Sequence, residues 1–127
     1  MATLKISDLS VGDWVRWKVY DNTYDMQVTG VTDRRIYGMH DGIEYSMLLS
    51  QICSIPITAE ILERNGFTCI EEDVDTALYG APSCSIFHTK GTLRYRLDTP
   101  QASVVCWNIH NLQHALRLAG VDKEIKL

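Results

Sequence analysis

The sequence predicts an α+β protein that is divided into two small parts, residues 1–56 and 57–127. Three observations support this prediction. Residues 13–20 alternate between apolar and polar side chains, as a half-buried strand does. Asp41-Gly42 lies between two apolar runs, which is the strongest short-range signal for a β-hairpin. Apolar residues recur at helical spacing over residues 105–119, directly before Gly120.

The first part is predicted to be a meander of five short strands. The expected strands are residues 13–20, 26–32, 36–40, 43–47 and 52–55, with Gly30 as a bulge and one tight turn over 48–51. Five short strands with a single turn before the last describe a small SH3-like barrel. Trp14 and Trp17 are three residues apart on the first strand and therefore point to opposite faces. One is expected in the core; the other packs in an ordinary way or lines a ligand groove, and ordinary packing is favoured.

The second part is predicted to begin and end with a helix. Thr58 is a suitable N-cap, and Gly66 a suitable left-handed residue after the last turn, for a short first helix. Three or four antiparallel strands are expected next, at residues 67–71, 77–79, 83–89 and 92–97. The final helix is expected over residues 105–119, with its apolar side packed on this small sheet.

The composition is that of a folded protein, with 46% hydrophobic and 22% charged residues. No segment approaches the ~20 apolar residues that a transmembrane helix needs, and the first eight residues lack the pattern of a secretory signal. The four cysteines form no C-x-x-C pair, which is typical of buried, reduced thiols. The sequence therefore predicts a soluble, cytoplasmic protein with no cofactor and no membrane partner.

The net charge of −4 argues against nucleic-acid binding, because neutralising phosphates needs a basic surface. The candidate basic clusters are Arg34-Arg35 and Arg94-Tyr95-Arg96, and a patch on the N-terminal barrel would have to be formed by Arg16, Lys18, Arg34 and Arg35. If these four side chains gather on one surface, the N-terminal barrel is a platform for nucleic acid. This is the first alternative function.

His110 and His114 have the spacing of two metal ligands on one helix face. The zinc-peptidase pattern also needs a glutamate directly after the first histidine, and Asn111 stands there instead. Two exposed or half-packed histidines are therefore favoured over a metal site. A small-ligand or metal-binding protein centred on this helix is the second alternative function.

A projection of the final helix places Trp107, His110, His114 and Leu118 opposite its apolar stripe. A tryptophan and a leucine are unusual on the outer side of a solvated helix. We expect this face to be buried, either within the chain or against an unidentified protein partner or a second copy in a homodimer. Packing against the chain's own barrel is favoured.

Sequence motifs of enzymes are absent. There is no G-x-S-x-G nucleophile motif, no G-x-x-x-x-G-K-[ST] phosphate loop and no G-x-G-x-x-G dinucleotide motif. No catalytic residue is assigned, and the favoured function is a non-enzymatic interaction or accessory module.

Two blocks of the sequence carry a family resemblance. The first comprises Leu9–Val15, Gln27–Val31 and Ile52–Phe67, and the second is Ile109–Gly120. Together they resemble a family of small uncharacterised proteins from gut Bacteroidetes and their prophages or mobile elements. The resemblance extends over nearly the whole chain, although Asn111 replaces the acidic residue usual in the family. It implies a bacterial or phage origin and the same barrel–helix–strands–helix order, and it implies no catalytic residue.

Overall fold

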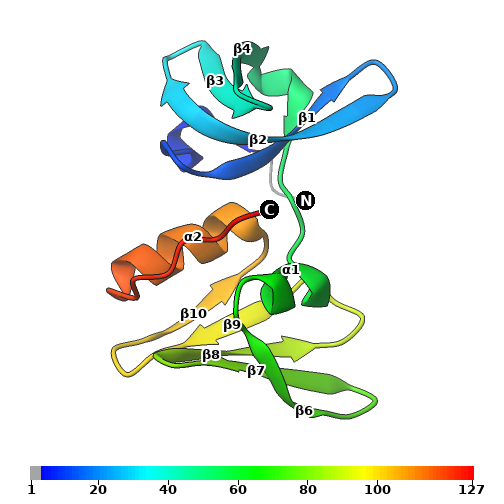
Figure 1. Cartoon of the computed structure of the whole chain (residues 1–127), viewed down its shortest axis with the longest axis vertical. Helices are drawn as coiled ribbons and strands as arrows, with labels where there is room; N and C mark the ends of the chain where they lie inside the picture. Colours follow the sequence, from blue (N-terminus) through cyan, green and yellow to red (C-terminus); the bar gives the residue numbers. More distant parts are fainter. Residues whose placement is uncertain (1–3) are drawn as a thin grey trace. The chain divides into compact units, whose positions relative to one another are not determined.

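A computed structural model describes residues 4–127. Residues 1–3 belong to the N-terminal stretch predicted to lack a secretory signal, and they lie outside the described residues. The chain forms two compact units, one ending at Ile55 and the other beginning at Pro56 (Figure 1). Each unit contains one five-stranded antiparallel sheet, so the α+β class predicted from the sequence is confirmed.

The N-terminal unit is a meander whose last strand returns beside the first. Its strands are β1 (Trp14–Val19), β2 (Asn22–Val31), β3 (Arg35–His40), β4 (Ile43–Leu48) and β5 (Ile52–Cys53), with 3-10 turns at Ile6–Asp8 and Leu49–Gln51. The sheet order is β4-β3-β2-β1-β5. Within the described residues neither sheet of the chain is closed, so the predicted SH3-like barrel is not confirmed. The strands β4 and β5 are the two edges of an open sheet.

The β3–β4 hairpin forms where the sequence predicts it. Asp41 and Gly42 have φ angles of 50° and 76°, as a two-residue hairpin loop requires. The β2 strand departs from the prediction, because it begins at Asn22 and not near Met26. The loop between β1 and β2 is Tyr20-Asp21, and Asn22 already pairs with Val19.

Alternation along the strands gives the N-terminal sheet one apolar face. The buried residues on it form a single cluster: Leu9, Val15, Met26, Val28, Ile36, Met47 and Ile52. Gly38 lies inside this cluster on β3. A Cβ atom there would be 2.7 Å from Met47 Cε and 3.3 Å from both the Gln27 carbonyl oxygen and Met26 Cβ. The absence of a side chain therefore lets β3 approach its neighbours closely.

The C-terminal unit is a second meander with two helices. Its elements are α1 (Ala59–Arg64), β6 (Thr68–Glu72), β7 (Thr76–Ala81), β8 (Cys84–Thr89), β9 (Tyr95–Asp98), β10 (Ser103–Cys106) and α2 (Ile109–Leu118). The strands follow one another in the order β10-β9-β8-β7-β6, and both helices lie on one face of the sheet (Figure 1). Thr58 caps α1 as predicted, since its Oγ1 accepts a hydrogen bond from the Ile61 N–H at 3.2 Å.

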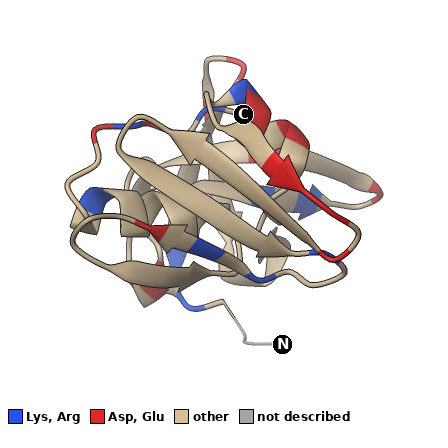
Figure 2. Ribbon diagram, turned by 90° about the horizontal axis from the view of Figure 1, so that it is seen from below, with Lys and Arg blue, Asp and Glu red and all other residues tan. Residues whose placement is uncertain are grey.

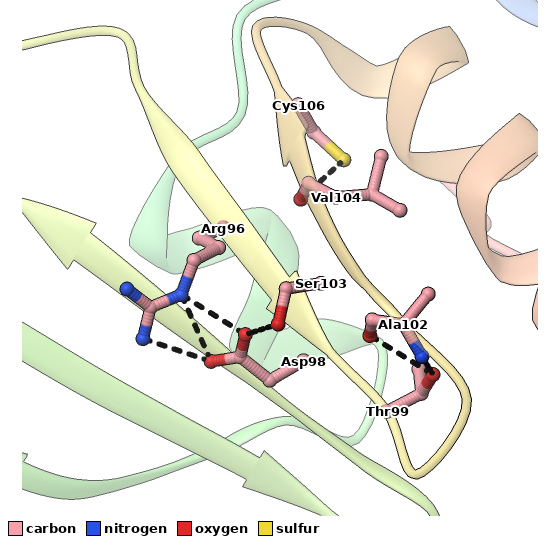
Figure 3. Close-up of polar contacts among 7 residues, drawn as sticks. All are labelled: Arg96, Asp98, Thr99, Ala102, Ser103, Val104 and Cys106. Carbon is pink, nitrogen blue, oxygen red and sulfur yellow. Dashed lines mark hydrogen bonds and ion pairs between the residues drawn. The ribbon is translucent and has the colours of Figure 1, made fainter.

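The fifth strand of this sheet, β10, corrects the sequence prediction. Residues 105–106 were assigned to the final helix, and only three or four strands were expected. Hydrogen bonds between Thr99 and Ala102 close a hairpin instead. Ala102 N–H donates to Thr99 Oγ1 at 3.1 Å (Figure 3), and Thr99 N–H donates to the Ala102 carbonyl at 2.9 Å. Pro100 occupies the second position of this turn, where its fixed φ is favourable.

The true start of α2 is marked by two asparagines. Asn108 Oδ1 accepts a hydrogen bond from the Asn111 N–H at 2.9 Å, and Asn111 Oδ1 accepts one from the Trp107 N–H at 3.2 Å. Trp107 therefore precedes the helix, which corrects its predicted place on the helix surface. The predicted apolar stripe is confirmed at Ile109, Leu112 and Leu116, which are completely buried.

A polar cluster on the exposed face of β9 and β10 supports the same hairpin. Arg96 Nε donates to Asp98 Oδ1 at 2.9 Å, and Ser103 Oγ donates to the same oxygen at 2.7 Å (Figure 3). The hydrogen bonds from Arg96 and, secondarily, from Ser103 lower the pKa of Asp98. On the other face, burial raises the pKa of the Cys106 thiol to about 11.

Candidate aromatic pocket

The apolar face of the N-terminal sheet ends in an open aromatic pocket of about 240 Å³. Its lining residues come from all four long strands: Trp17, Val19, Tyr24, Met26, His40 and Tyr45. Met26 is completely buried, whereas Tyr24 is 36% exposed. The pocket is thus bounded by the core on one side and by partly exposed rings on the other.

Strand alternation explains why these side chains meet. Trp17 lies two residues from Val15 on β1, and Tyr24 lies two residues from Met26 on β2, so both share the face of the buried cluster. Trp17 and Tyr24 are also directly opposite each other in the β1–β2 pairing. Their ring centroids are 6.2 Å apart with the planes tilted by 48°.

Curvature of the sheet brings the fourth strand to the same place. Two strands separate β1 from β4 in the sheet order, and yet the rings of Trp17 and Tyr45 are 5.3 Å apart. A flat sheet would hold strands three places apart at roughly 14 Å. The apolar face is therefore strongly concave, and the pocket lies in this concavity.

Hydrogen bonds hold the rings in fixed positions. Trp17 Nε1 donates to Gln51 Oε1 at 3.3 Å, and the same oxygen accepts from the Leu48 N–H at 3.1 Å. Gln51 lies in the 3-10 turn that connects β4 to β5. The tryptophan indole is thus tied to the segment that follows β4.

His40 forms the other end of the aromatic row. Its ring centroid is 5.3 Å from that of Tyr24, in an edge-to-face arrangement. Its Nδ1 is 3.2 Å from the Asp25 carbonyl oxygen, which can only accept, so the proton lies on Nδ1. Its Nε2 points toward the Asp41 carboxylate, at 3.5 Å.

The surroundings of the pocket are acidic. Asp41 is in the β3–β4 loop directly after His40, and its side chain is 88% exposed. Asp21 is in the β1–β2 loop, two residues after Val19. Among the lining residues that the structure describes, none is Lys or Arg. One carboxylate, that of Asp41, therefore adjoins a lining residue of the pocket, and Asp21 is a second acidic residue in the β1–β2 loop.

No protein-family model, curated protein or solved structure matches the chain. The function of the pocket therefore has to be inferred from its own residues.

The four residues of the predicted basic patch lie in two separate places. Arg16 and Lys18 are on β1, where Arg16 Nε is 3.1 Å from Asp25 Oδ1. Arg34 and Arg35 are at the β2–β3 turn. On β2, Arg16 pairs with Asp25 and Lys18 with Thr23, whereas the β2–β3 turn follows Val31. The two places are therefore six to eight residues, or roughly 20–26 Å, apart along the strand. In Figure 2 the basic positions form short, separated stretches of the ribbon.

The residues of the predicted partner face on α2 differ in their exposure to solvent. His110 is 2% exposed, which agrees with the expected burial of this face and corrects the expectation of an exposed or half-packed histidine. Leu118 is 89% exposed and Trp107 is 53% exposed, so the expected burial of these two side chains is not found within the chain. Trp107 precedes α2, and Leu118 is the last residue of that helix.

The two helix histidines do lie side by side, as their spacing predicts. The ring centroids of His110 and His114 are 6.0 Å apart. Within residues 4–127, no group of three or more His, Cys, Asp or Glu side chains is close enough to hold a metal ion. In the same part of the chain, no helix is long and apolar enough to cross a membrane.

Sequence reasoning identified one residue of the pocket and missed its neighbours. Trp17 was one of two tryptophans considered for a ligand groove. Tyr24 was missed because β2 was predicted to begin after it, and Tyr45 was missed because sheet curvature is not visible in the sequence. A usable signal was the pairing of aromatic residues at alternating positions on both sides of the β1–β2 loop.

Proposed function

We propose that the chain is a non-enzymatic interaction module whose N-terminal unit binds a segment of a partner protein in the aromatic pocket. The observation that supports this function is a concave site lined by Trp17, Tyr24 and Tyr45, with rings still partly open to solvent. Aromatic side chains dominate the binding energy of protein interfaces because they bury a large area with few rotatable bonds.

The geometry of the site favours binding because its rings are held in place before a ligand arrives. The Trp17 indole is fixed by Gln51, and the His40 ring by the carbonyl of Asp25. A preorganised site loses little side-chain entropy when it binds. The ring nitrogens of Trp17 and His40 already have protein partners, which leaves the faces of these two rings as the contact surface.

The strand order supports a finer proposal for the fold of this unit. The unit has four strands in a meander, a 3-10 turn and a short fifth strand beside the first. These are the features for which an SH3-like barrel was predicted. We propose that the unit is an open relative of that architecture. A role as an accessory protein of a prophage or mobile element rests on the family resemblance, and the genes neighbouring its own provide the test.

Selection of peptides on the purified full-length chain tests the proposed function. A bead-displayed library of random synthetic peptides, which includes methylated and acetylated lysine, is screened against the chain, and individual binders are then measured with the Tyr24→Ala and Tyr37→Ala variants. Tyr37 is a matched control because it alternates with the buried residues Ile36 and Gly38 and so lies on the opposite face of the same sheet. We expect binders that lose affinity with Tyr24→Ala and keep it with Tyr37→Ala. Binders that ignore Tyr24, or no binders at all, would contradict the proposal.

A further inference from the structure

Building on the proposed function, we propose that the pocket recognises a quaternary ammonium group, carried by a trimethylated lysine side chain of the partner polypeptide. The inference follows from three features of the site: ring faces, acidic residues in the adjoining loops and exposed apolar side chains in the same loops.

The ring faces attract cations. The face of each aromatic ring carries partial negative charge, and a cation within about 6 Å of the ring centre is attracted by it. Trp17 is the strongest ring of this kind, and it lies 5.3 Å from Tyr45 and 6.2 Å from Tyr24. A cation in the pocket therefore contacts several rings at once.

The flanking charges have the complementary sign. The carboxylate of Asp41 adjoins His40, and Asp21 occupies the other loop. A bound nucleobase would stack on the same rings, but its phosphates would meet these carboxylates without a lysine or arginine among the lining residues to neutralise them. Charge thus favours a cationic ligand over a nucleic acid.

Methylation explains how a cation enters without losing hydrogen bonds. A primary ammonium group has three N–H donors, and ring faces do not replace the water that it leaves. A trimethylammonium group has no N–H donor, and its methyl groups pack against apolar surface. The Trp17 Nε1–H and the His40 Nδ1–H are themselves donors, so they cannot accept from an ammonium group, and the remaining ring nitrogen, His40 Nε2, faces the Asp41 carboxylate.

The surroundings of the pocket suit a polypeptide better than a free small molecule. Val19 and Met26 provide apolar surface for the lysine stem inside the pocket. Outside it, the two adjoining loops expose large apolar side chains, since Tyr20 is 99% and Ile43 is 56% exposed. A chain extending from the trimethyllysine can cover both, whereas choline would leave them in water.

Four probes test the proposal on the full-length chain: N-acetyl-trimethyllysine methylamide, its unmethylated lysine counterpart, its neutral carbon isostere and choline. Binding is followed by the NMR signal of the Trp17 indole, which is assigned with the Trp17→Phe variant. We expect the trimethyllysine probe to bind about tenfold more tightly than the lysine probe and the neutral isostere. It should also bind more tightly than choline.

Two pairs of variants separate the contributions of rings and charge. Tyr24→Leu keeps an apolar side chain but removes the ring. It should weaken binding of the trimethyllysine probe about tenfold and leave the affinity for the neutral isostere unchanged. Tyr37→Leu should change neither. Asp41→Asn should weaken binding of the trimethyllysine probe about twofold at low salt. The control is Asp33→Asn, in the β2–β3 turn at the other end of the sheet, which should leave this affinity unchanged.

Each contrary result has a distinct meaning. Equal affinity for the neutral isostere would overturn the requirement for a cation, and tighter binding of choline would overturn the assignment to a polypeptide. If selected peptides bind through Tyr24 but none of the four probes does, the ligand class is wrong and the interaction module stands. If neither the peptides nor the probes depend on Tyr24, both proposals fail.

Discussion

Replacing Gly38 with alanine is expected to destabilise the N-terminal unit. The new methyl group would be 2.7 Å from Met47 Cε and 3.3 Å from two further atoms of β2, so the surrounding core must shift. Overpacking of a core costs about 1–3 kcal/mol, while the lower entropy of the unfolded chain returns about 0.4–1 kcal/mol. Because Met47 Cε is the end of a flexible side chain, we expect a net loss of about 1–2 kcal/mol, which lowers Tm by roughly 5–10 °C.

Gly30 provides the matched control. It lies in the same sheet, but a Cβ atom there would meet only Tyr37 atoms, at 3.7 and 3.8 Å, which is ordinary contact. Gly30→Ala should therefore leave stability unchanged or raise it by about 0.5 kcal/mol. Both variants are made in a Trp107→Phe background, so that Trp14 and Trp17 alone report urea unfolding by fluorescence. If the two substitutions change the free energy of unfolding in the same direction, the close approach of β3 is not what requires glycine.

Three further predictions concern the C-terminal unit. Thr58→Ala removes the cap of α1 and should lower the free energy of unfolding by about 1 kcal/mol in urea titrations followed by circular dichroism. The lowered pKa of Asp98 means that its contribution to stability is present above about pH 4 and is lost as pH falls further. The difference in free energy of unfolding between the native chain and Asp98→Asn should therefore shrink below that pH. A difference independent of pH would refute this. In thiol labelling at pH 8, exposed Cys69 should react at once. Burial raises the pKa values of Cys84 and Cys106, so these two thiols should react only as the unit unfolds. Equal labelling rates for all three would contradict the burial of Cys84 and Cys106.

Local signals in the sequence were sufficient wherever one short segment determines the backbone. The Asp41-Gly42 loop needs two positive φ angles, and few other residue pairs supply them. Thr58 caps α1 with its own hydroxyl group. Both features depend on contacts within four residues, so no knowledge of the distant chain was needed.

The start of α2 could not be predicted because two local patterns overlap there. Val105 continues the helical spacing of Ile109 and Leu112, but Val104 and Val105 are also β-branched residues that suit a strand. Pairing of β10 with β9 decides the outcome, and this pairing depends on the turn at Thr99. The helix then begins at the next residue able to cap it, Asn108.

The pocket depends on a long-range feature that no single segment encodes. Tyr45 reaches Trp17 because the sheet curves, and Gly38 is the residue directly opposite Tyr45 in the β3–β4 pairing. A methyl group on Gly38 would thus push against the core at the strand that carries Tyr45 into the site. We therefore expect Gly38→Ala to weaken binding of the trimethyllysine probe beyond its effect on stability, even at temperatures where the unit is fully folded. Gly30→Ala, made at the bulge of the same sheet, should bind the probe as the native chain does. Unchanged affinity in Gly38→Ala would show that the concave shape of the site is maintained without the close approach of β3.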